Sequence, residues 1–163
     1  MSKKPETRIL YASLGPDPIW LQWEQVKRWR ARVQEAAPSG DGFDLRDYLM
    51  AYMGSLFAMR DWISHARPEL NNEVDQLFED SQELRVLRDV VNGSKHMSLR
   101  DRSTDGGDED SIFSEWSDEG PVLTVPARGG PNRRAVDLAN ECYGQIESFV
   151  ARHRLLAAGS DRT

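Results

Sequence analysis

The sequence predicts a mainly α-helical fold, namely an antiparallel bundle of four to five helices with a small β-hairpin excursion. Apolar residues recur at helical spacing through four long segments. Prolines fall at the ends of these segments, where a helix must start or stop. Only one short region, 112–125, shows the alternation of a hairpin. At 163 residues, the chain has the length of one such domain.

The first two helices have clear boundary signals. The first is expected to start with Asp17 as N-cap and Pro18 in the first turn, and to end at 37–40. The second begins near Asp41 or Asp44 and stops before Pro68. It carries the most apolar pattern of the chain, so we expect it at the centre of the bundle.

A short helix over 68–78 leads into the segment that carries the candidate site. Asp80-Ser-Gln-Glu83 matches a capping box, with Asp80 as the cap, and is expected to open a helix that continues to about Leu99. After an acidic loop at 101–111, two short strands are expected to pair around 117–120.

The last helix is expected over 133–156, with Gly159 just beyond its end. Together with 45–65 it should be one of the two longest helices. Cys142 lies in its apolar stripe and is expected to be a small buried hydrophobe. The domain plan is therefore an N-terminal arm at 1–16, one helical domain at 17–157 and a C-terminal tail at 158–163.

The negative charge of the chain is concentrated in one segment. The whole chain carries −6, yet residues 101–119 hold eight acidic residues and one basic residue, which gives −7 there and about +1 elsewhere. The charge therefore neither indicates nor excludes a nucleic-acid partner. Asp101-x-Ser-x-Asp105-Gly starts like a calcium loop, but its twelfth position is Ile112, which cannot ligate calcium.

Several classes of protein are not expected. The chain has no apolar run of about 18 residues and no apolar stretch behind its basic N-terminus, so we expect a cytoplasmic protein without a membrane partner. A single cysteine cannot form an internal disulfide, and His65, His96 and His153 do not have zinc-ligand spacing. We therefore expect no metal and no cofactor.

The candidate site lies in the helix that Asp80 opens. Arg88, Asn92 and His96 recur at intervals of four residues, and Asp89 and Lys95 lie beside them. Their stripe is polar, whereas the opposite stripe is apolar and consists of Leu84, Leu87, Val90 and Val91. Histidine can transfer a proton near neutral pH, and arginine or lysine can hold a phosphate. The set could therefore cleave RNA without a metal, or it could be a salt-bridged surface helix.

An arginine, a polar residue directly after it and a histidine late in one helix of an all-helical protein resemble the HEPN superfamily. This resemblance implies a metal-independent ribonuclease or RNA-binding protein of a bacterial or phage defence or toxin system. It also implies a homodimer, with Arg88 and His96 catalytic and Asp89, Asn92 and Lys95 in support. Seven residues separate Arg88 from His96, however, against four to six in the family pattern. The Asn92-Gly-Ser-Lys-His96 run also resembles a motif of uncharacterised bacterial helical proteins.

Two other functions fit the same sequence. One is a non-enzymatic interaction module whose polar face serves packing or partner binding. The other is a small-ligand site with His96 and tryptophans as its walls. Trp20, Trp23 and Trp29 share the first helix with four basic residues, which indicates either a core stripe with a solvated cationic face or a surface for single-stranded nucleic acid.

Overall fold

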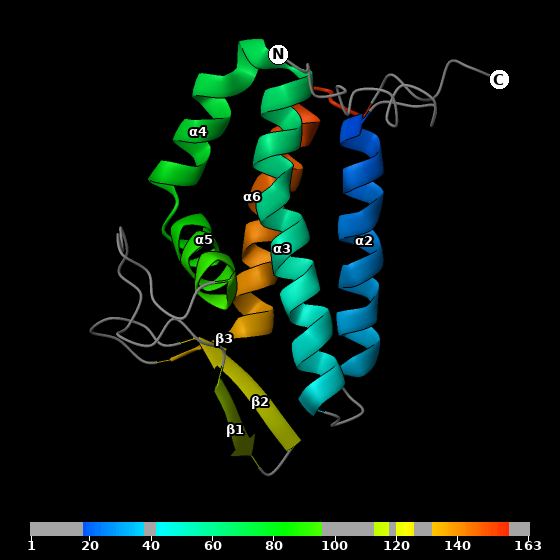
Figure 1. The fold of residues 1–163 in the computed structure, drawn as a ribbon, viewed down its shortest axis with the longest axis vertical. Coiled ribbons are helices and arrows are strands. Elements are labelled where there is room, and N and C mark those ends of the chain that lie inside the picture. The colour runs from blue at the N-terminus through cyan, green and yellow to red at the C-terminus, as the bar shows by residue number, and fades with distance from the viewer. Residues whose placement is uncertain (1–17, 38–41, 96–112, 118–119, 126–131, 157–163) are drawn as a thin grey trace, which may run out of the picture.

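The prediction of a mainly helical bundle with a small β-hairpin is confirmed. The computed structural model describes residues 18–37, 42–95, 113–117, 120–125 and 132–156. Its elements, shown in Figure 1, are α2 (Pro18–Ala36), α3 (Gly42–Ala66), the 3-10 helix η1 (Pro68–Leu70), α4 (Asn71–Asp80), α5 (Gln82–Lys95), β1 (Phe113–Ser117), β2 (Gly120–Val125), β3 (Arg133–Arg134) and α6 (Ala135–Arg152). The predicted acidic loop at 101–111 lies outside the described residues.

The helices are arranged around α3. In Figure 1, α2, α3 and α6 stand upright next to one another, whereas α5 is seen nearly end-on and so lies across the bundle. α3 contacts α2, α4, α5 and α6 and also touches the sheet through β2. None of the helices in the described ranges combines the length and apolar character that a membrane-spanning segment requires.

The apolar character of α3 explains its central place. Its buried residues follow helical spacing and form the middle of the core: Leu45, Leu49, Tyr52, Met53, Leu56, Met59 and Ile63. Burying each side chain of this size contributes roughly 1.5–3 kcal/mol. The expectation that this helix forms the centre of the bundle is therefore confirmed.

α2 forms an antiparallel pair with α3 and begins at Pro18 as expected. The buried side chain of Gln22 donates a hydrogen bond from Nε2 to the carbonyl oxygen of Ser55, over 2.9 Å. The buried ring of Trp23 stacks on Tyr143 of α6, with 5.0 Å between ring centroids. Cys142, next to Tyr143, is buried as predicted.

The small sheet closes one end of the bundle. β1 and β2 pair antiparallel, with Ser117 opposite Gly120, so the predicted hairpin is confirmed. β3 then pairs with β2 through Thr124 and Arg134. Because residues 133–134 belong to this sheet, α6 begins two residues later than expected. With 18 residues, α6 is shorter than α2, which has 19, so the expectation that the last helix is one of the two longest is wrong.

α6 also ends earlier than the sequence indicated. The amide of Leu155 donates to the carbonyl of Val150 over 3.0 Å, and the amide of Arg154 donates to Ala151 over 3.1 Å. These two bonds form a Schellman motif, which stops the helix at Arg152. Arg154 occupies its left-handed position with φ of 51°, where glycine is the usual residue. Glycine was the expected stop signal, and this helix stops without one.

Replacing Arg154 with glycine is expected to stabilise the protein. A non-glycine residue in the left-handed region costs roughly 1–2 kcal/mol. Glycine avoids this cost but loses more backbone entropy on folding, which offsets part of the gain. Arg154→Gly should therefore raise the free energy of unfolding by about 0.5–1 kcal/mol. Urea denaturation measures the change. The matched control is Ala151→Gly, which removes a helix former from the exposed last turn of α6 and should destabilise by about 1 kcal/mol. A loss of stability in Arg154→Gly would show that the left-handed conformation of Arg154 does not destabilise the protein.

Tyr52 carries a polar atom in the core. Its side chain is buried between helices, and its hydroxyl oxygen has no hydrogen-bond partner among the described residues. Burial raises the pKa of this hydroxyl, while the nearby Arg30 opposes the rise. The aromatic ring therefore stabilises the core and the hydroxyl does not.

Tyr52→Phe is accordingly expected to leave the free energy of unfolding unchanged or to raise it by about 1 kcal/mol, because it removes a buried hydroxyl that lacks a partner. Tyr143→Phe is the control. The Tyr143 hydroxyl donates to Glu147 over 3.0 Å, so losing it should destabilise the protein. Thermal and urea unfolding of both variants provide the comparison, and a Tyr52→Phe variant that loses more than Tyr143→Phe would refute this view of the core.

Candidate functional site

Helix α5 carries the predicted site residues as far as the structure describes them. Arg88, Asp89 and Asn92 lie on it, and Lys95 is its last residue. His96 lies outside the described residues, and so does the side chain of Lys95. The structure therefore places Arg88 beside Asp89 and leaves the expected pairing of Arg88 with His96 a prediction.

The cap of α5 differs from the expected one by one residue. The Oγ atom of Ser81 accepts a hydrogen bond from the amide of Leu84 over 3.1 Å, which makes Ser81 the N-cap in place of Asp80. Ser81 also ends α4, because its amide donates to the carbonyl of Leu77. One serine thus serves both helices, and Asp80 remains the last residue of α4.

The apolar stripe of α5 is confirmed, but its polar stripe is less exposed than expected. Leu84, Leu87, Val90 and Val91 are all buried. Asp89 is also buried, with 5% of its surface exposed. The reason is that α3, α4 and α6 all contact α5, so the helix is covered on more than one side.

Arg88 is held from two directions. Its Nη1 atom lies 2.7 Å from Oε1 of Glu79, and its Nε atom lies 3.7 Å from Oδ1 of Asp89. The exposed fractions of these side chains are 15% for Arg88, 56% for Glu79 and 7% for Asp89. The inner carboxylate is thus buried and the outer one is in solvent. Arg85 adds a second bond between α5 and α4 by donating to the carbonyl of Glu79.

The end of α5 near α6 is fixed by a network around Glu83. Its Oε2 atom accepts from Nε2 of Gln145 at 3.0 Å and from Oγ of Ser81 at 3.1 Å. Arg133 lies 3.5 Å from its other oxygen and also pairs with Glu141. The backbone N–H of Glu83 itself, helped by these neighbours, holds the pKa of this carboxyl below its usual range. The network joins the α4–α5 junction to α6.

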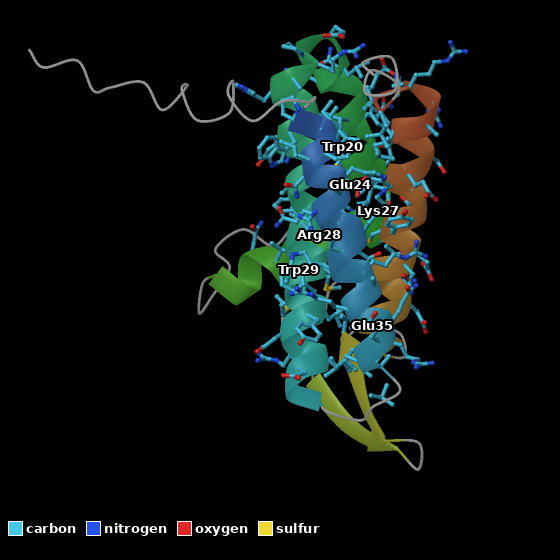
Figure 2. All side chains as sticks on the ribbon, turned by 90° about the vertical axis from the view of Figure 1, so that its right-hand side faces the viewer. Trp20, Glu24, Lys27, Arg28, Trp29 and Glu35 are labelled. Atoms are coloured by element: carbon cyan, nitrogen blue, oxygen red, sulfur yellow. The ribbon has the colours of Figure 1, made fainter. Side chains whose placement is uncertain are left out.

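The tryptophans of α2 divide into two kinds. Trp23 belongs to the core, as the core interpretation of this helix predicted. Trp20 and Trp29 are half-buried, and Figure 2 shows them on the face of α2 that is turned to the viewer, together with Lys27 and Arg28. The guanidinium of Arg32 lies 4.6 Å from the ring centroid of Trp29. This outer face carries both aromatic and cationic groups.

A groove between α4 and α6 was not predicted from the sequence. It encloses about 440 Å³ and is lined mainly by polar residues, with Leu77 and Phe149 as its apolar part. His153 packs its ring on Phe149 at 4.4 Å between ring centroids, and its Nε2 atom lies 3.4 Å from Oε2 of Glu73.

The described residues do not group three histidine, cysteine, aspartate or glutamate side chains as a metal ion would require. Comparisons of the chain with protein-family models, with curated proteins and with solved structures return no match. The geometry of the described residues is therefore the basis for the function proposed below.

The Glu83 network is expected to make stability depend on pH. Because the folded pKa of Glu83 lies below its unfolded value of about 4.3, its charge stabilises the protein above that pH, and the contribution is lost as pH falls through the folded pKa. Glu83→Gln should cost about 1–2 kcal/mol at neutral pH and much less near pH 3.

Urea denaturation at both pH values measures this difference. Glu35→Gln, on the exposed end of α2, is the control and should change little at either pH. An equal loss in Glu83→Gln at both pH values would show that the charge is not responsible.

Proposed function

We propose that the protein binds RNA at α5 and cleaves it without a metal, with Arg88 and His96 as catalytic residues and Asp89, Asn92 and Lys95 in support. A cytoplasmic homodimer of the HEPN-like kind belongs to the same proposal. The observation that carries it is the way Arg88 is held. Its inner edge is fixed by the buried Asp89, and its outer edge faces the exposed Glu79.

This arrangement suits a phosphate-binding arginine. An exposed ion pair such as Arg88–Glu79 contributes only about 0–1 kcal/mol, so a phosphate can replace the Glu79 carboxylate at little cost. During the exchange Asp89 keeps the guanidinium in its orientation. Once Glu79 is displaced, Nη1 of this guanidinium can donate to a phosphate oxygen and stabilise charge that develops on it.

The chemistry assigned to His96 is proton transfer. A neutral imidazole takes the proton of the ribose 2′-hydroxyl, and the oxygen attacks the adjacent phosphorus. The bond from phosphorus to the 5′-oxygen then breaks, and that oxygen takes up a proton. The products are a 2′,3′-cyclic phosphate and a free 5′-hydroxyl. No metal takes part, so a chelator is expected to leave the rate unchanged.

Cleavage of single-stranded and structured RNA by four variants tests this proposal. His96→Ala and Arg88→Ala should abolish cleavage or reduce it at least a hundredfold, since each removes a group that acts in the transition state. Arg85→Ala removes the same charge one turn away and is the matched control. Glu79→Gln should increase cleavage at low RNA concentration, because it removes the anion that competes with phosphate for Arg88.

Melting temperatures of the same variants separate chemistry from folding. A wild-type protein that leaves every RNA intact would refute the ribonuclease. Cleavage that survives in His96→Ala, or that falls equally in Arg85→Ala and Arg88→Ala, would refute the assigned residues. A chelator-sensitive rate would refute the metal-independent mechanism.

A second function, that of a non-enzymatic interaction module, is favoured by the outer face of α2. Trp20 and Trp29 are large aromatic side chains that remain half-exposed there (Figure 2), and aromatic residues are enriched at protein interfaces. In this case Arg88 only joins α5 to α4. The wild type would then be inert on RNA, while Arg88→Ala would lower the melting temperature.

A further inference from the structure

The groove between α4 and α6 contains two charged side chains that no neighbour neutralises. Asp80, at the end of α4, and Arg152, at the end of α6, both line the groove. Within the described part of the chain, neither side chain forms a hydrogen bond or an ion pair. A carboxylate and a guanidinium in one cavity, each without a partner, complement a ligand that carries both charges.

The two charges lie at opposite ends of the groove. The contact of His153 with Glu73 places the end of α6 beside the start of α4. The bonds from Gln145 and Ser81 to Glu83 place the middle of α6 beside the end of α4. The two helices are therefore antiparallel along the groove. Position 80 comes seven positions after position 73, which is about 10 Å along a helix axis.

The middle of the groove suits an uncharged chain. Leu77 and the ring of Phe149 provide an apolar surface there, while the side-chain amides of Gln76 and Gln145 can donate and accept hydrogen bonds. The Gln145 amide is already oriented through its bond to Glu83. A cavity of about 440 Å³ also lies within the usual range of about 300–1,000 Å³ for small-molecule sites.

We propose that this groove binds a short extended peptide of about three residues with both of its termini free. Three extended residues span at most about 10 Å, which matches the separation of the two ends. The peptide ammonium lies at Asp80, where the carbonyl end of α4 also favours a cation. The peptide carboxylate lies at Arg152 and can form two parallel bonds with the guanidinium. The central side chain packs on Leu77 and Phe149.

Glu73 lies at the end of the groove where the peptide carboxylate is placed, and its negative charge opposes binding of that carboxylate. Its Oε2 atom lies 3.4 Å from Nε2 of His153, so its charge is directed at the histidine. The negative charge of Glu73 still opposes the peptide carboxylate that Arg152 is proposed to bind. Glu73→Gln should therefore strengthen binding of the free peptide, an effect that a purely structural role of the groove would not produce.

Isothermal titration of the whole protein with Ala-Leu-Ala tests the proposal, with N-acetylated and C-amidated forms of the same peptide as matched ligands. Each blocked form is expected to bind at least tenfold more weakly than the free peptide. Asp80→Asn should bind the free and the acetylated peptide equally, and Arg152→Gln should bind the free and the amidated peptide equally. Both residues are exposed, so circular dichroism should show unchanged folding.

Three results would overturn the proposal. One is the absence of saturable binding of Ala-Leu-Ala at millimolar concentration. Another is blocked peptides that bind as well as the free one. The third is Ala-Ala binding as tightly as Ala-Leu-Ala, since a dipeptide cannot reach both ends. The site uses no residue of the ribonuclease proposal, so either proposal can fail while the other stands.

Discussion

The structure depends on one constraint, which is that α3 must be covered along its whole length. Its buried side chains follow helical spacing along one broad face, and several neighbouring elements together cover this face. α2 covers one side as an antiparallel neighbour, and α4, α5 and α6 cover the others. Between α4 and α5 the chain changes direction, because α5 lies across the bundle. The change occurs at Ser81, whose side chain caps α5 and whose backbone amide donates to the last turn of α4.

The sequence was sufficient for those parts of the fold that local patterns determine. The seam of α3, the start of α2 at Pro18 and the β1–β2 hairpin each follow from residues that are close in the chain. The exceptions are also local, but two signals compete there. Ser81 caps α5 although Asp80 is an equally good cap by residue type, because only the serine accepts the Leu84 amide. α6 stops at a Schellman motif built on Arg154, whose energetic cost is met by the burial of Leu155.

The candidate site could be predicted only in part, because its geometry depends on contacts with other helices that local sequence patterns do not reveal. The apolar stripe of α5 is visible in the sequence, and so is the grouping of Arg88, Asp89 and Asn92 on the other side. The sequence does not show that Asp89 is buried, because its burial depends on helices that are distant in the chain. The partner of Arg88, Glu79, belongs to the preceding helix. The groove is still less visible, since its two walls are separated by about 60 residues of chain.

α4 contacts α5, which carries the proposed ribonuclease site, and also forms one wall of the groove proposed to bind a peptide. A helix of ten residues is marginal on its own, so tertiary contacts determine where it lies. Val74 and Phe78 anchor it in the core, and an ion pair of 2.8 Å between Arg60 and Asp75 ties it to α3. Glu79 then faces the arginines of α5, while Glu73 and Asp80 face α6. A substitution on one side can therefore shift the whole helix and change the other side. For this reason a loss of cleavage in Arg88 or Glu79 variants identifies a catalytic role only when the melting temperature and the binding of Ala-Leu-Ala to the groove are unchanged.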